Sequence, residues 1–231
     1  MSNIRFVNKG SRGEIWLYDN VGEDPWFGVG MSSKTFAAEV QKLGKVDTIN
    51  LRINSLGGSV REGIAIYNTL NNHPARIEVD VDSWACSIAS VIAMAGDEIR
   101  MAENAMMMIH DPHGVSVGGA EEMRKTADLL DQIKQTIANT YSKRTGKKEA
   151  DVMAMMTAET WMTATQAQDM GFADAITGEQ RIAACSKFDI SNFKHPPKEL
   201  LDAIRGERSA GHSMANVKLV HMDTRSRVAT R

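Results

Sequence analysis

Short apolar stretches separated by turn residues make up most of residues 1–110 of the chain. Helical spacing interrupts them at 59–72, where Ile64 and Leu70 fall largely on one face and Ser59 can act as the N-cap. A second segment rich in small residues, 87–95, also predicts a helix. The stretches that predict β-strands are residues 4–7, 14–18, 47–54, 76–82, 98–102 and 106–110. Strands and helices that alternate in this way predict an α/β fold in layers, with right-handed crossovers.

A longer helical pattern follows at residues 119–144, and Gly146 provides its stop signal. The apolar positions that recur there at three- and four-residue steps, over about seven turns, are Met123, Ala127, Leu130, Ile133, Ile137 and Tyr141. A helix of this length is expected to project from the domain and to pack on something else. Two shorter helices, 148–156 and 165–170, and a strand at 172–176 complete the predicted domain.

The character of the chain changes after about Gly178. Residues 187–231 carry nine Lys and Arg against five Asp and Glu, and prolines and glycines interrupt them. We therefore expect two parts: a folded domain at 1–178, and a basic, weakly ordered tail at 179–231. Within the tail, the pattern predicts a short helix at 199–205 and a strand at 217–222. The tail is interpreted either as solvated chain or as a segment that docks onto a partner.

Composition narrows the class of protein. The chain has 231 residues, 42% of them hydrophobic and 24% charged, as in an ordinary globular domain. Its net charge of −2 gives no reason to expect nucleic acid as a partner. The two cysteines, Cys86 and Cys185, provide no disulfide framework, and the longest apolar stretch, 88–96, is too short to span a bilayer. The start of the chain lacks the pattern of a signal peptide. We expect a soluble protein of a reducing cytosol, without a cofactor or a metal site.

Candidate chemistry first appears where predicted strands meet predicted helices. Residues 54–60 contain a Gly57-Gly58 pair, which lets backbone approach a ligand and offers N–H groups as donors. Residues 85–90 place Ser87 at the start of a helix, where unsatisfied N–H groups can meet the negative charge of a tetrahedral intermediate. Each feature also has a plain structural interpretation: a simple turn for the glycines, and an N-cap for the serine.

A histidine supplies the third feature. His110 ends an apolar strand just before a loop, so it can present its imidazole at the edge of a sheet. A histidine with a packing or surface role would look the same in the sequence. His113, three residues later, ranks below His110 as a candidate base.

Together these motifs resemble a known family. The segments INSLGGSV, ACSIASVIAMAG, MMMIHDP, a long helix that ends at TG, and ETWMTATQAQDMGFADAI occur in this order with compatible gaps. They resemble the proteolytic subunit of the Clp protease over about residues 15–176. The ClpP-like proteases of tailed phages and prophages look closer still and share the ETW form of the last segment. Those relatives are associated with head maturation, in which scaffold or capsid precursors are cut.

The resemblance implies a fold and a set of site residues. The fold is the ClpP/crotonase-like α/β fold of repeated β-β-α units, with a projecting long handle helix. Ser87 would be the nucleophile of a serine endopeptidase and His110 its general base, while Gly58 and Ile88 would donate backbone N–H groups to the oxyanion. Glu159 falls at the position of the acidic residue.

The acid is the member of the site with the most alternatives. This chain has glutamate where the longer-studied members have aspartate, and Asp111 and Asp174 are competitors. Two further departures, Ser83 in place of a glycine and Leu56 in place of a proline, are mild.

The resemblance also implies partners and leaves alternatives for the function. An extended polypeptide would bind as an added strand between the strand around 57–60 and the stretch 114–118, and the long helix would interlock two rings face to face. A Clp-type ATPase is a further implied partner, and the implied location is the bacterial host cytosol or a phage procapsid. General ATPase-fed degradation, an inactive ring-building subunit and a crotonase-type acyl-CoA enzyme are the alternatives. The Ser-His pair speaks against the last of these.

Overall fold

A computed structural model describes residues 4–22, 30–178 and 193–197 of the chain. By internal contacts the chain divides into two units, Met1–Asp189 and Ile190–Arg231. All of the described helices and strands lie in the first unit. The helix and strand predicted at 199–205 and 217–222, and Cys185, lie outside the described residues. Within those residues, no helix has the length and apolar character that a membrane span requires.

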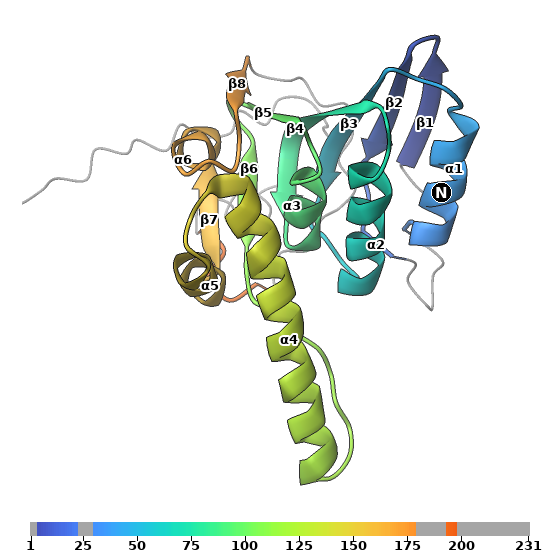
Figure 1. Cartoon of the computed structure of the whole chain (residues 1–231). Helices are drawn as coiled ribbons and strands as arrows, with labels where there is room; N and C mark the ends of the chain where they lie inside the picture. Colours follow the sequence, from blue (N-terminus) through green and yellow to red (C-terminus); the bar gives the residue numbers. More distant parts are fainter. Residues whose placement is uncertain (1–3, 23–29, 179–192, 198–231) are drawn as a thin grey trace, which may run out of the picture. The chain divides into compact units, whose positions relative to one another are not determined.

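An eight-stranded sheet forms the centre of the first unit (Figure 1). Its main path runs β1-β2-β3-β4-β5-β8, and β6 pairs with both β4 and β7. Neighbours on the main path are parallel, except that β1 and β2 form an antiparallel pair. The strands are β1 (Ile4–Lys9), β2 (Arg12–Leu17), β3 (Thr48–Ser55), β4 (Arg76–Cys86), β5 (Glu98–Ala102), β6 (Met106–Ile109), β7 (Thr160–Thr163) and β8 (Ala175–Thr177).

Strand β4 is the longest strand and changes its partner along its length. Its first part pairs with β5, and its last residues pair with β6, in register from Trp84↔Met106 to Cys86↔Met108. Strand β6 then pairs antiparallel with β7. The ends of β4 and β6 are thereby brought side by side, although Cys86 and Met108 are 22 positions apart in the sequence.

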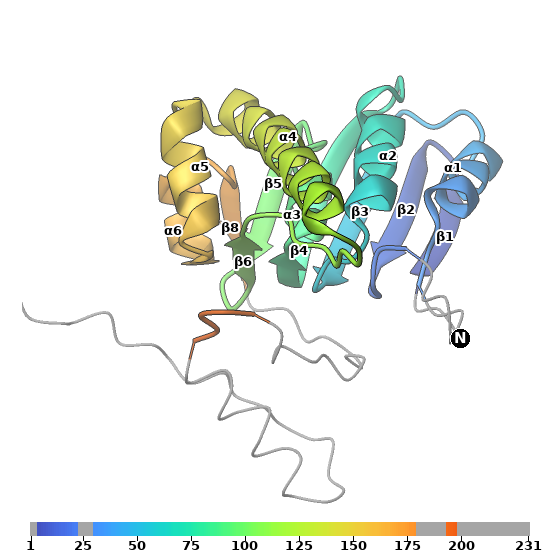
Figure 2. The same ribbon diagram turned by 90° about the horizontal axis from the view of Figure 1, so that it is seen from below.

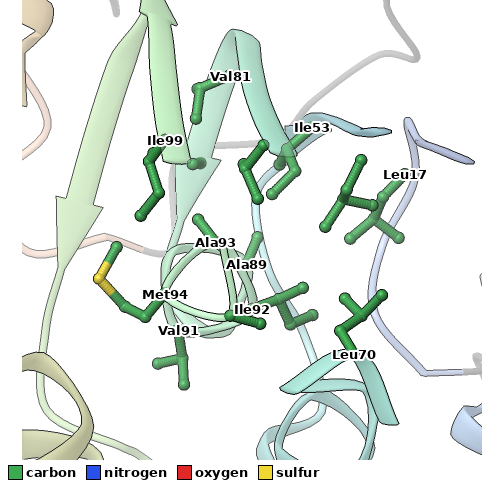
Figure 3. Close-up of a cluster of buried hydrophobic side chains, with 14 of the residues drawn as sticks. Leu17, Ile53, Leu70, Val81, Ala89, Val91, Ile92, Ala93, Met94 and Ile99 are labelled. Atoms are coloured by element: carbon green, nitrogen blue, oxygen red, sulfur yellow. The ribbon is translucent and has the colours of Figure 1, made fainter. Parts of the chain in front are cut away.

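Three helices, α1 (Ser33–Lys42), α2 (Val60–Asn71) and α3 (Ile88–Ala93), lie along one face of the sheet (Figure 2). All six residues of α3 are buried, and it packs among apolar side chains of the sheet and of α2 (Figure 3). The labelled members of this core are Leu17, Ile53, Leu70, Val81, Ala89, Val91, Ile92, Ala93, Met94 and Ile99. Small residues in α3 allow it to sit close to the strands, which fixes the turn that precedes it.

The alternate positions of the same strands carry charge. Arg52 forms an ion pair with Asp82 at 2.5 Å, and the Arg100 guanidinium lies 2.7 Å from Asp80. Asn50 donates a hydrogen bond to Asp80 at 2.6 Å. Because successive strand residues point to opposite faces, this network lies on the face opposite the apolar core.

The second half of the unit contains three helices, α4 (Ala120–Thr145), α5 (Glu149–Thr157) and α6 (Ala164–Asp169), besides β7 and β8. The buried residues of α4, which are Ile137, Ala138 and Tyr141, all belong to its second half. Its first half extends away from the sheet (Figure 1). The αL conformation of Gly146 ends the helix, as predicted.

The α/β fold expected from the sequence is confirmed, and the elements predicted within the described residues occur within a few residues of their expected bounds. Helix α1 and strand β7 have no counterpart among the predictions. Residues 57–60 are not a strand: Gly58 forms an isolated bridge with Val21, and α2 begins at Val60.

Candidate active site

Ser87 lies in the sharp turn between β4 and α3. Its backbone has φ 54° and ψ −130°, in a region where side-chain-bearing residues are uncommon. Its hydroxyl makes no capping hydrogen bond to α3, in contrast to the N-cap interpretation of this serine. Instead, Ser87 Oγ lies 2.8 Å from Nε2 of His110. A hydroxyl at this distance from an imidazole nitrogen can transfer its proton to it.

The pairing of β4 with β6 explains why these two side chains meet. Cys86 and Met108 are opposite each other in the register, and the Ser87 N–H donates to the Met108 carbonyl at 2.9 Å. His110 follows the last residue of β6, two positions after Met108. The half-buried His110 is therefore delivered to the turn by the sheet itself. His113 is exposed, with its ring centroid 5.5 Å from that of His110.

The glycine pair approaches the same turn from the other side. A β-carbon added at Gly57 would lie 2.7 Å from the Ser87 β-carbon, so only glycine allows this approach. Val21 N–H donates to the Gly57 carbonyl, and Ser59 N–H donates to the Val21 carbonyl, both at 2.8 Å. Gly57 and Gly58 have φ of 98° and 142°, in the region that favours glycine. Ile88, as the first residue of α3, has an N–H without an intrahelical partner.

Glu159 lies between α5 and β7 and is only 4% exposed. The last pair of the β6–β7 register is Ile109↔Thr160, so the next residue along each strand is His110 and Glu159. The backbone at Glu159 has φ 52°, and its carboxylate accepts a hydrogen bond from the Trp161 indole N–H at 3.3 Å.

The competing carboxylates are engaged elsewhere. Asp111 forms an ion pair with Lys134 of α4 at 3.0 Å. Asp174 accepts a hydrogen bond from the Ile99 N–H at 2.7 Å and forms an ion pair with Arg144. Their contacts hold both carboxylates in structural ion pairs.

A small pocket opens beside the Ser87 hydroxyl, with a mostly apolar lining. It is lined by Val60, Ser87, Ile88, Val91, His110, Pro112, Ile137 and Tyr141. These residues come from α2, α3, α4, the turn before α3 and the segment after β6. Within the described ranges, no group of three or more His, Cys, Asp or Glu side chains is arranged to hold a metal ion.

Comparisons with known proteins show which family has this arrangement. The model of the Clp protease family matches residues 33–180. The chain belongs to the Clp protease family. The ATP-dependent Clp protease proteolytic subunit 1 of Leifsonia xyli subsp. xyli is 34% identical over 167 residues, which are 70% of this chain and 81% of that protein. A proteolytic subunit from Streptococcus pneumoniae is 33% identical over 132 residues, covering 55% and 67% of the two chains.

The fold agrees with this membership. A mutant of ClpP1 from Listeria monocytogenes superimposes with a TM-score of 0.63 at 20% identity, over 73% of this chain and 92% of that one. The prediction of a serine-type endopeptidase of the ClpP type is thus confirmed at the level of the family.

In this member of the Clp protease family, the buried thiol of Cys86 lies beside the nucleophile turn but is not a candidate nucleophile. Burial first, and the nearby charge of Glu159 second, raise the pKa of the Cys86 thiol well above its usual range. A thiol held in that state is a poor nucleophile.

Two further groups near the turn were not singled out as site residues from the sequence. Ser90 and Tyr141 are joined by a buried hydrogen bond of 2.7 Å behind Ser87. They are 51 residues apart, and no periodicity or motif connects them.

Proposed function

We propose that Ser87 is the nucleophile and His110 the general base of peptide-bond hydrolysis. The observation that carries the proposal is the 2.8 Å separation of Ser87 Oγ and His110 Nε2 at a strand-to-helix turn. With its own proton on Nδ1, His110 accepts the hydroxyl proton at Nε2 while Oγ attacks the carbonyl carbon. The imidazolium then protonates the amine as the C–N bond breaks. Water, activated by the same imidazole, hydrolyses the acyl ester and restores the serine.

The oxyanion needs hydrogen-bond donors, and the imidazolium needs a negatively charged partner. We assign the backbone N–H groups of Gly58 and Ile88 to the oxyanion, because both belong to backbone that flanks Ser87. Glu159 is assigned to His110, since the β6–β7 register continues to this pair. A buried carboxylate there would hold one tautomer and stabilise the imidazolium.

The substrate in this proposal is an extended polypeptide. The backbone at Gly57 and Gly58, and the segment 114–118, would flank the bound chain on either side. We place the peptidase domain at residues 1–178 with 179–231 as an appended basic tail, because the match to the family ends at residue 180.

Two biological roles fit such an enzyme. The relatives are proteolytic subunits of an ATP-dependent Clp protease, which favours a ring fed by a Clp-type ATPase in the cytosol. The ETW form of residues 159–161 favours processing of phage scaffold or capsid precursors, in the host cytosol or within a procapsid. We propose the second role and keep general degradation as the alternative.

The neighbouring genes and a cleavage assay distinguish these roles. For head maturation, portal and major-capsid genes should lie beside this gene, and the purified enzyme should cut the encoded precursor at defined sites without an ATPase. Complete degradation of an unfolded protein that depends on a Clp ATPase, with no cleavage of the precursor, would support the alternative.

A fluorophosphonate probe tests the nucleophile directly. Ser87 should be the labelled residue, and Ser87→Ala should abolish labelling and lower peptide cleavage by about 10⁴-fold or more, because the members of a triad act as a unit. Ser90→Ala serves as the control, in which the label should still be found at Ser87. Labelling that persists in Ser87→Ala would refute the assignment.

A further inference from the structure

Behind the nucleophile turn lies a buried group of hydroxyls that the proposed mechanism does not use. Ser90 on α3 is fully buried, and Tyr141 on α4 is 1% exposed. Ser90 Oγ lies 2.6 Å from the Ser87 carbonyl oxygen, 3.1 Å from the Met108 carbonyl oxygen and 2.7 Å from the Tyr141 hydroxyl. The serine hydroxyl therefore has three polar partners on three different segments.

The direction of these hydrogen bonds follows from the atoms present. Carbonyl oxygens only accept, so the single proton of Ser90 is directed to the carbonyls of Ser87 and Met108. The remaining partner, Tyr141, then donates its own proton to Ser90 Oγ. A chain results in which Tyr141 donates to Ser90 and Ser90 donates to the backbone. Successive bonds of this kind strengthen one another in a buried site.

The two acceptors are the backbone groups that set the geometry of the Ser-His pair. One is the carbonyl of Ser87 itself. The other is the carbonyl of Met108, which also accepts the Ser87 N–H at 2.9 Å and lies two residues before His110. The Ser90 hydroxyl thus bridges the nucleophile turn and the strand that carries the base.

Tyr141 is itself held firmly from behind. Its ring packs edge-to-face on Phe172, with centroids 5.6 Å apart, and burial raises the pKa of its hydroxyl so that it stays protonated. We infer that Ser90 and Tyr141 are positioning residues that keep Ser87 Oγ within reach of His110 Nε2. This inference rests on the proposed roles of Ser87 and His110.

The experiment measures the rate of fluorophosphonate labelling per folded chain, well below the unfolding midpoint of each variant. A small probe reports the reactivity of Ser87 without a contribution from peptide binding. Ser90→Ala should slow labelling by about 10- to 100-fold, since small misplacements of reacting groups have effects of that size. Tyr141→Phe keeps the ring on Phe172 and should slow labelling by roughly 3- to 10-fold.

Coupling between the two side chains provides the second readout. The double variant should be no slower than Ser90→Ala alone, because Tyr141 acts through Ser90. With a peptide substrate, kcat should fall while KM changes little. Tyr67→Phe and Ser142→Ala are the matched controls, since they remove hydroxyls from α2 and from the end of α4, and they should label at the rate of the unchanged protein.

Several outcomes would overturn the inference. Labelling of Ser90→Ala at the unchanged rate would do so, and so would a loss that follows only the fraction of unfolded protein. If Ser90→Ala does not fold, Tyr141→Phe decides alone, and an unchanged rate in it counts against the inference. Labelling that survives Ser87→Ala would instead refute the proposed nucleophile, so the two failures are distinguishable.

Discussion

Within the described part of the chain, two non-glycine residues, Ser87 and Glu159, adopt positive φ. Both were singled out from the sequence as members of one site, and both lie at junctions between elements. Their unusual backbone conformations are not visible in the residue types, because neither serine nor glutamate favours that region. Strained backbone of this kind is common at functional sites, in agreement with the proposed roles of both residues.

Replacement of the acid is the sharpest test at this scale. If Glu159 orients His110, Glu159→Gln should lower kcat by orders of magnitude, because the amide cannot stabilise the imidazolium. Assembly and folding should be unchanged, as judged by light scattering and circular dichroism. Asp174→Asn is the control: its carboxylate is bound to Ile99 and Arg144, so it should affect turnover far less. Near-normal turnover of Glu159→Gln would mean a Ser-His dyad or a different acid.

At the scale of elements, the turn that carries the glycine pair makes a separate prediction. Gly57→Ala would place a β-carbon 2.7 Å from that of Ser87 and 2.8 Å from the Cys86 carbonyl oxygen. The turn must shift, so probe labelling should fall by about 100-fold or more.

Gly44→Ala is the matched control, because Gly44 also has positive φ but no atom within 4 Å of the added β-carbon. Both variants should lose about 1 kcal/mol of stability from the backbone conformation alone. Gly57→Ala with unchanged labelling would show that the close approach is not needed for reactivity.

Most elements were predictable because their signals are local. The strands of the core alternate or run apolar, and the stop at Gly146 and the cap at Ser59 are short-range features. Helix α1 was missed because only two of its ten residues, Phe36 and Val40, are large and apolar, which is too few to establish a repeating pattern. Strand β7 was missed because its four residues are too few to show an alternation.

The candidate site was less accessible to local reasoning. The meeting of Ser87 with His110 depends on the change of partner along β4, which is a long-range feature that no periodicity reports. The pairing of Ser87 with His110 was predicted from the resemblance to a known family. Nothing in the sequence indicated the contact of Ser90 with Tyr141, which depends on where α4 packs.

At the scale of the whole molecule, the second half of α4 packs on the domain, whereas its first half is exposed and can contact another molecule. Its 26 residues correspond to about 39 Å of helix. Large apolar side chains are exposed near its beginning: Val115, Val117, Met123 and Leu129. Exposed apolar groups gathered in this way are typical of an interaction surface.

We expect the chain to form a ring or double ring through this surface, with the active sites facing an interior chamber. Light scattering at micromolar concentration should give the mass of a multimer. Val117→Asp combined with Leu129→Lys should reduce that mass, whereas the neighbouring change Asp128→Asn should not. A monomer for the unchanged protein would contradict the expectation.

The backbone at Ser87 has a consequence for the stability of the whole protein. Glycine usually makes a folded chain less stable than alanine by about 0.5–1 kcal/mol. At φ 54° this order should reverse, because a β-carbon there costs about 1–3 kcal/mol that glycine avoids. Chemical denaturation should therefore find Ser87→Gly more stable than Ser87→Ala, although both lack the hydroxyl. If so, the serine at this position lowers the stability of the fold and is retained for its reactivity. In a homologue that has lost catalysis, replacement of this serine by glycine would raise stability and should be accepted.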